Sequence, residues 1–223
     1  MSGAAHSPST IVGMEAAAPA TSALRRELGG WAWIAVGALA VAGLFALLLA
    51  LSRAIDAVNE KLSWIADWLV FLSCLISAGN AFSRYAFSIS SNAWLEIQWY
   101  MFGALVMLGT SYTLKKNEHV RVDIVYSNIS TRKQIGVDIF GTILFLLPAT
   151  LIMAFLSWPV FYNSWIEGEI SGNAGGLIRW PIKIFLPLGF ALLSLQGFSE
   201  LIKRIAMLTG HMKADLHYER PLQ

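Results

Sequence analysis

Long apolar segments separated by short polar connections dominate the pattern of this chain. Four of these segments cover residues 64–86, 94–114, 134–158 and 180–202. Each is close to the length of about 20 apolar residues that crosses a bilayer as a helix. A further apolar segment, residues 31–51, contains no charged residue; an interfacial or peripheral helix is the alternative there, but we favour a spanning helix. The pattern therefore predicts an all-α, multi-span integral membrane protein with four spans and an extra N-terminal span.

These segments divide the chain into regions of different composition. Residues 1–28 are rich in Ala, Ser, Pro and Thr, and we expect a flexible tail because such a segment has little apolar surface to bury. Residues 31–51 form the extra helix, 62–204 the four-span domain, and 205–223 a polar cytoplasmic tail. Residues 52–63 are predicted to be a short polar connection that could lie as an amphipathic turn on the membrane surface.

Positive charges concentrate in the connection from Lys115 to Lys133, which carries five Lys and Arg residues. Short loops of this kind stay on the cytoplasmic side, because positive charge resists translocation. The orientation predicts that residues 161–179 lie outside and that the C-terminus lies in the cytoplasm. If residues 31–51 span, the N-terminal tail lies outside. The alternative is that the basic connection is merely a solvated linker.

The composition supports a membrane protein and excludes several other classes. The chain is 56% hydrophobic and 13% charged, whereas soluble domains carry about 25% charged residues. A net charge of +2 without a basic, aromatic patch argues against nucleic acid as a partner, so the lipid bilayer is the expected surroundings. Cys74 is the single cysteine and therefore offers neither an internal disulfide nor a metal-binding spacing.

No constellation for catalysis or cofactor binding is found in the sequence. A transmembrane haem would require histidines at membrane depth, but His6, His119, His211 and His217 all fall in predicted loops or tails. His119 beside the basic cluster is more simply a solvated loop residue than a ligand. We therefore expect no catalytic residue, no cofactor and no metal. A small membrane protein without a buried acid cluster is better suited to support a transporter than to be a complete one.

One predicted span carries a polar stripe. Ser73, Ser77, Asn80 and Arg84 recur at intervals of four, three and four residues, which places them on one helical face. Polar groups that face lipid are unfavourable, so this stripe should face protein. Two interpretations remain open: packing within this chain, and docking of a partner.

Two further polar residues lie within predicted spans. Glu96 lies near the start of a helix, where the backbone dipole favours negative charge, and across a short turn from Arg84, with which it could pair. An ion-binding role for Glu96 is the alternative, but no second carboxylate accompanies it. Gln196 is a lone interior polar group in the last span.

Several short motifs together carry a resemblance to a known family. In chain order they are Asn80…Arg84-Tyr85-x-Phe87, Trp94-x-Glu96-x-Gln98-Trp99, His119-Val120-Arg121-Val122-Asp123, Trp165…Gly168-Glu169, Arg179-Trp180 and Leu195-Gln196. In this order the chain resembles the small transmembrane subunit (Q component, DctQ-like) of tripartite ATP-independent periplasmic (TRAP) transporters. The resemblance covers roughly residues 62–204.

The resemblance implies a supporting role in a transporter of the bacterial inner membrane. A large membrane subunit would carry the substrate and sodium sites and work as an elevator, and a periplasmic solute-binding protein would deliver an organic acid. The small subunit would enlarge the stationary scaffold. We expect partner-binding or structural roles for Ser73, Ser77, Asn80, Arg84, Glu96, Gln98, Trp99, His119, Arg121, Asp123, Glu169, Trp180 and Gln196.

Two other classes of membrane protein fit the sequence less well than a transporter subunit. A membrane anchor of a redox enzyme would need haem or quinone ligands at membrane depth, which the histidine positions do not supply. A small intramembrane enzyme would need an acid, base or nucleophile constellation, which the sequence lacks.

Overall fold

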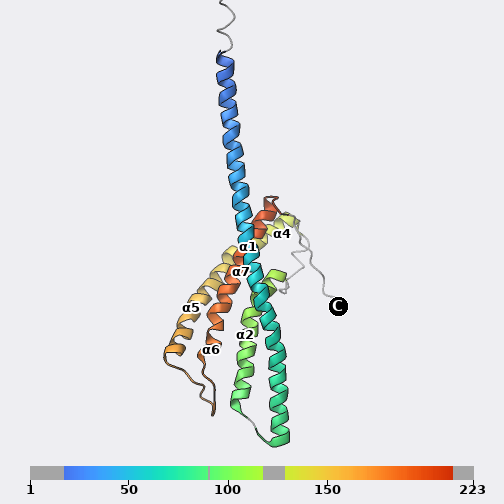
Figure 1. Cartoon of the computed structure of the whole chain (residues 1–223), viewed down its shortest axis with the longest axis vertical. Helices are drawn as coiled ribbons and strands as arrows, with labels where there is room; N and C mark the ends of the chain where they lie inside the picture. The colour runs from blue at the N-terminus through green and yellow to red at the C-terminus, as the bar shows by residue number, and fades with distance from the viewer. Residues whose placement is uncertain (1–17, 90, 118–128, 213–223) are drawn as a thin grey trace, which may run out of the picture. The chain divides into compact units, whose positions relative to one another are not determined.

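The computed structural model describes residues 18–89, 91–117 and 129–212, with side chains from residue 31 onward. Its elements are helices (Figure 1): α1 (Ala18–Phe87), α2 (Asn92–Lys116), α4 (Thr131–Gly141), the π-helical turn η1 (Thr142–Leu146), α5 (Leu147–Ile166), α6 (Trp180–Lys183) and α7 (Phe185–Leu208). The prediction of an all-α protein is confirmed.

Three helical stretches in the described part of the chain are long and apolar enough to cross a membrane. They are Trp31–Phe87, Thr131–Ile166 and Trp180–Leu208. They support a membrane protein with several spans. Helix α2, which covers the predicted span 94–114, is not one of the three, although its 25 residues suffice in length. Polar residues such as Thr110 and Ser111 interrupt its apolar sequence.

Helix α1 differs from the prediction at two places. It begins at Ala18, so the end of the segment expected to be a flexible tail, residues 1–28, is helical. It also continues without a break through residues 52–63, and the prediction of a connection there is wrong. This segment contains neither Gly nor Pro, the residues that interrupt helices most strongly. Its polar side chains bind other helices instead of ending α1.

The described chain divides after Leu47 into two units, which we treat separately. In the first unit, the described side chains from Trp31 to Leu47 are exposed, except for the half-buried Phe45. Trp33 is 78% exposed and Leu39 is 73% exposed. A helix that is apolar on all sides belongs in a membrane or in a protein core, so this part of α1 needs an apolar environment that its own unit does not supply.

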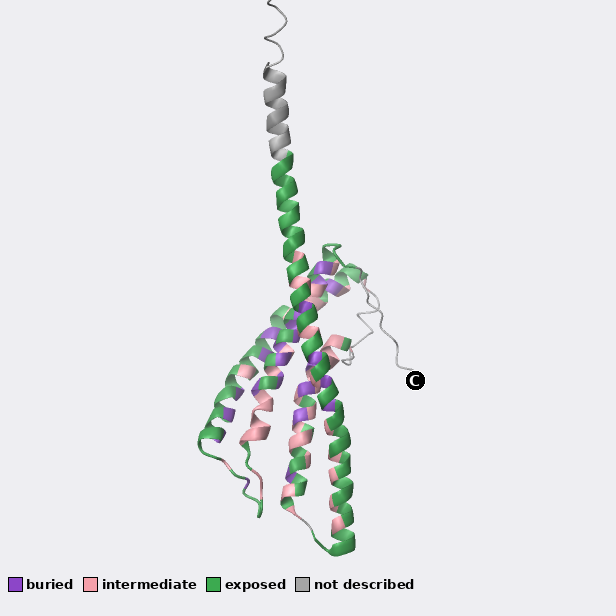
Figure 2. Cartoon of the chain, viewed as in Figure 1, coloured by how far each residue is buried: buried purple, intermediate pink, exposed green. Residues whose placement is uncertain are grey.

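The second unit is organised around α7. Helix α7 packs against α2, α4 and α5, and buried residues follow its length (Figure 2). An apolar core joins Ala66 of α1, Leu108 of α2 and Leu192 of α7. Helices α7 and α2 approach closely at Gly189 of α7, where an added Cβ would lie 2.9 Å from the carbonyl oxygen of Met107 in α2. Only glycine therefore allows α2 and α7 to pack at this distance.

The last predicted span begins where the sequence places it. Helix α6 starts at Trp180, with Pro181 in its first turn, where the missing N–H leaves no helical hydrogen bond unmade. A turn at Ile184 separates α6 from α7. Trp180 is half-buried, and its ring lies 6.2 Å from that of Trp165 at the end of α5. These contacts join the two ends of the loop between α5 and α6.

Candidate functional site

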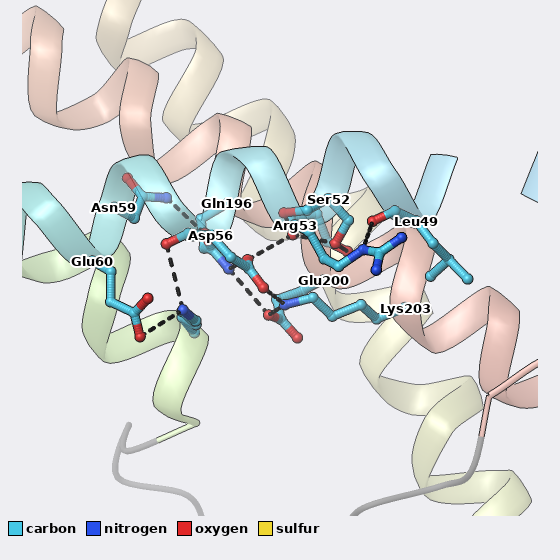
Figure 3. A network of polar contacts seen from close by, with 11 residues as sticks. Leu49, Ser52, Arg53, Asp56, Asn59, Glu60, Gln196, Glu200 and Lys203 are labelled. Atoms are coloured by element: carbon cyan, nitrogen blue, oxygen red, sulfur yellow. Dashed lines mark hydrogen bonds and ion pairs between the residues drawn. The ribbon is translucent and has the colours of Figure 1, made fainter. Parts of the chain in front are cut away.

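A carboxylate on α1 is the centre of the largest group of polar contacts between helices (Figure 3). One oxygen of Asp56 accepts hydrogen bonds from Gln196 Nε2 and Ser199 Oγ of α7, both at 2.9 Å. Its other oxygen lies 2.7 Å from the ammonium of Lys203. Both charged side chains are 16% exposed. Charge-assisted hydrogen bonds of this kind are stronger than neutral ones, so Asp56 holds α1 against α7.

Fully buried amides extend these contacts to α2. Asn59 Nδ2 donates to Gln196 Oε1 at 2.6 Å, and Ser111 Oγ of α2 donates to Asn59 Oδ1 at 3.1 Å. All three side chains are at most 1% exposed. Ser52 adds a hydroxyl contact of 2.7 Å to Ser199. A buried polar group is favourable only when it is hydrogen-bonded, and here each amide or hydroxyl meets a partner on another helix.

Further charges surround this group, which we call the Asp56 network: Ser52, Asp56, Asn59, Ser111, Gln196, Ser199 and Lys203. Glu200 lies 2.8 Å from Lys203 and also accepts from Gln196 at 3.1 Å. Lys115, in the last turn of α2, pairs with Glu60 at 3.2 Å. The Asp56 network therefore lies at the end of the second unit where α2 terminates and where α7 carries its basic residues.

The sequence indicated only one member of the Asp56 network, Gln196. The missed signal is a second polar stripe: Ser52, Asp56, Asn59 and Ser63 are spaced by four, three and four residues on α1. The prediction of a short polar connection over residues 52–63 follows instead from their charged residues. In the structure all four are buried or half-buried. Their helical spacing therefore indicates their burial, whereas their charge content does not.

A second ion pair fixes α4 to α7. Arg204 of α7 bonds to the carboxylate of Asp138 in α4. The side chains of Arg204 and Asp138 are 10% and 14% exposed. About three turns of α7 nearer to its start, Ser194 donates to Thr150 of α5 at 2.8 Å. Helix α7 thus has polar contacts to α1, α4 and α5.

Glu96 holds the loop 167–179, which connects α5 to α6. One oxygen of Glu96 accepts from the hydroxyl of Ser171 and from Asn173 Nδ2 at 2.7 Å, and the other accepts from the backbone N–H of Leu177 at 2.7 Å. Glu96 is buried, at 8% exposure. Tyr100, one turn further along α2, donates to the carbonyl of Ile178 at 3.2 Å. The loop is therefore bound to α2 along most of its length.

Glu169 closes the base of the same loop. It bonds to Lys183 of α6 and lies 3.7 Å from Arg179. The hydrogen bond from Lys183 is the main reason that the pKa of Glu169 lies below its usual value. A lowered carboxyl pKa means that the contact is present at neutral pH and is lost as the pH falls through that pKa. An antiparallel bridge between Ile170 and Ile178 joins the two sides of the loop.

The expected pairing of Glu96 with Arg84 is wrong. Within the described residues, all hydrogen-bond partners of Glu96 come from the loop 167–179, and Arg84 is exposed. The sequence suggested the pair because the two residues flank one short turn. The loop lies more than 70 residues further along the chain, and its donors reach Glu96 because α6 and α7 bring it back beside α2.

The predicted stripe of α1 falls into two environments. Ser73 and Asn80 are half-buried and belong to a regularly spaced seam that contains Leu62, Ala66, Leu69, Ser73, Ile76, Asn80 and Ser83. This seam faces α2, since residues of both helices line the same hollows. Ser77 and Arg84 are exposed. Packing within the chain thus accounts for Ser73 and Asn80, and not for Ser77 and Arg84.

Gln98 and Trp99 lie beside that seam. Gln98 lines a hollow with Ser73, and its Nε2 is buried without a hydrogen-bond partner among the described residues. Trp99 lines the same hollow and is 77% exposed. The remaining candidates, His119, Arg121 and Asp123, lie outside the described residues. Within the described residues no group of three or more His, Cys, Asp and Glu side chains could hold a metal ion.

The fold is that of a membrane protein with several helices. Its buried polar groups bind one another across these helices. The family model of the DctQ component of tripartite ATP-independent periplasmic transporters matches residues 73–207, well over half of the chain. The chain therefore belongs to this family and is a small membrane component of a TRAP transporter. No curated protein and no solved structure matches the chain in the two other comparisons.

The family assignment settles the broad class of function. DctQ components are transport subunits without enzymatic activity, and they belong to inner-membrane systems of three parts. The family therefore implies two partners, a large membrane component and a periplasmic binding component. The alternatives of a redox anchor and an intramembrane enzyme find no support in this match.

Proposed function

We propose that the chain enlarges the stationary scaffold of a large, elevator-type membrane subunit that takes up an organic acid with sodium. The proposal rests on the family match and on the fact that the buried polar groups of this chain bind one another. The Asp56 network, the Arg204–Asp138 pair and the Glu96 contacts all join parts of this chain. A scaffold must keep its shape while another domain moves against it, and buried polar networks rigidify such a frame.

The proposed arrangement follows the distribution of basic residues. Residues 62–204 would form four spans and residues 31–51 an additional membrane helix. The basic connection 115–133 and the C-terminus would be cytoplasmic, and the loop 167–179 would face the periplasm, where the solute-binding protein arrives. The Glu96 contacts support this role for the loop, because a docking surface held in one conformation loses less entropy on binding.

Uptake measurements test the supporting role. The chain reconstituted alone in liposomes, with the binding protein and a sodium gradient, should give no uptake above empty liposomes for any organic acid tried. Adding the large membrane subunit should restore uptake. Sodium-driven uptake by this chain without the large subunit would contradict the scaffold role.

Cysteine labelling tests the orientation. In a Cys74→Ser background, Ala174→Cys in the loop 167–179 should react with an impermeant maleimide on spheroplasts. Arg132→Cys, at the start of α4, should react only after the membrane is opened. Both native side chains are exposed in the structure, so a difference in labelling reports the side of the membrane. The reverse pattern would invert the proposed topology.

A further inference from the structure

An acidic side chain on the apolar part of α1 has no polar partner among the described residues. Asp67 lies in the candidate span Trp31–Phe87 and is exposed. Neither a hydrogen bond nor an ion pair of Asp67 is present among the described residues. The other acidic residues of this part of α1, Asp56 and Glu60, are both paired with lysines. A charge within a membrane span faces protein or a water-filled cavity as a rule, so Asp67 requires a partner from elsewhere.

Three aromatic side chains surround this carboxylate. Trp64, Trp68 and Phe71 line one hollow together with Asp67. The rings of Trp64 and Trp68 are 6.0 Å apart, as are those of Trp68 and Phe71, and both pairs meet edge to face. The three rings are 63%, 49% and 57% exposed, in that order. Aromatic faces attract cations, so the rings and the carboxylate favour the same ligand, a Lys or Arg side chain.

The hollow lies on the side of α1 that the second unit leaves uncovered. The seam toward α2 runs through Ala66, Leu69 and Ser73. Successive residues of a helix are about 100° apart around its axis, so Asp67 and Phe71 project from another side of α1. The hollow is therefore accessible to another membrane protein.

Lipid headgroups and a second copy of this chain fit this hollow poorly. Asp67 follows Lys61 by six residues, which is about 9 Å along a helix axis, and its short side chain cannot extend to the surface as Lys and Arg do. Two copies inserted in the same orientation would place Asp67 beside Asp67 at equal depth, and like charges oppose such a contact.

We infer that Asp67, Trp64, Trp68 and Phe71 form a docking site for a basic side chain on a transmembrane helix of the large membrane subunit. This inference rests on the proposed function for the presence of that subunit. The carboxylate pairs with the cation, and the rings cover it from lipid. Such a pair also selects for depth and register, because the partner's Lys or Arg must reach the level of Asp67.

Photo-cross-linking in the assembled complex tests the site directly. The full chain with benzoyl-phenylalanine in place of Phe71 is co-expressed with the large subunit and irradiated in membranes. We expect an adduct with the large subunit, located by mass spectrometry in a helix that carries a Lys or Arg. Asp67→Asn in the same chain should lower the adduct yield at least about tenfold, since loss of one member of a close interfacial charge pair is unfavourable by more than that factor.

The matched control is Glu167→Gln, which neutralises an exposed carboxylate outside the candidate spans and should leave the adduct yield unchanged. Asp67→Lys should abolish the adduct, and Glu in place of the mapped Lys or Arg should restore it. An adduct at Phe71 with lipid or with a second copy, while the large subunit still co-purifies, would overturn this inference and leave the proposed function intact. Failure of the unaltered chain to co-purify with any large subunit would instead contradict the proposed function.

Discussion

A Gln196→Leu variant is expected to lose about 2–3 kcal/mol of unfolding free energy in detergent. Gln196 is fully buried and bonds to Asn59, Asp56 and Glu200. One hydrogen bond between membrane helices contributes about 0.6 kcal/mol on average and up to about 1.7 kcal/mol. The variant loses several, and it also leaves the buried Nδ2 of Asn59 without an acceptor, which is unfavourable by about 1–3 kcal/mol.

Gln98→Leu is the matched control, because the substitution is the same and the starting amide has an unsatisfied N–H donor. The Nε2 atom of Gln98 is buried without a hydrogen-bond partner among the described residues, so its removal should change the stability of the isolated chain by less than about 1 kcal/mol or increase it. Circular dichroism during titration with a denaturing detergent measures both variants. Equal losses at the two positions would show that Gln196 contributes volume rather than hydrogen bonds.

Local sequence patterns predicted most helices of this chain, because hydropathy and spacing depend on nearby residues. The segments 134–158 and 180–202 fall within helical stretches of the structure. The segment 52–63 was predicted wrongly because charge was used as the sign of a connection. In helices of a membrane protein, buried polar residues bind other helices, and Asp56 and Asn59 do so without interrupting α1.

Polar partners could not be predicted in the same way, because they are far apart in sequence. Asn59 and Gln196 are separated by 137 residues, and Glu96 and Leu177 by 81. Gln196 and Glu96 were recognised as unusual polar residues within spans, which is a local property. Their partners depend on which helices become neighbours, and the turn beside Glu96 suggested Arg84 instead of the loop 167–179.

Asp67 is another residue whose importance could not be predicted from nearby residues alone. Its sequence position within an apolar segment is evident, but its significance depends on the absence of a partner in the described fold and on the aromatic rings that line its hollow. Both facts become evident only when the packing of α1 is known. An unpaired charge becomes informative only after the pairs of Asp56 and Glu60 are known.

Replacing Glu96 by Gln is expected to accelerate hydrogen exchange at the Leu177 amide by roughly ten- to a hundredfold, the range for a backbone N–H that loses a charged acceptor. Leu177 N–H donates to one oxygen of Glu96, and Ser171 and Asn173 donate to the other. A glutamine side chain offers only one oxygen, and its NH₂ group cannot accept. The single oxygen is expected to face the two side-chain donors Ser171 and Asn173, so the Leu177 N–H is the donor that loses its acceptor.

Two control variants distinguish loss of the Glu96 contact from a general loss of protection in the loop 167–179. Glu167→Gln alters an exposed carboxylate of the same loop, and Arg84→Ala removes the residue that the sequence had suggested as the partner; neither should change exchange at Leu177. If Arg84→Ala accelerated exchange as strongly as Glu96→Gln, Arg84 would be part of the loop contact after all. If Glu96→Gln left Leu177 protected, the bridge between Ile170 and Ile178 and the Tyr100 contact would be sufficient to hold the loop. Because the loop is the proposed periplasmic surface, faster exchange should be accompanied by weaker capture of the binding protein by the assembled transporter.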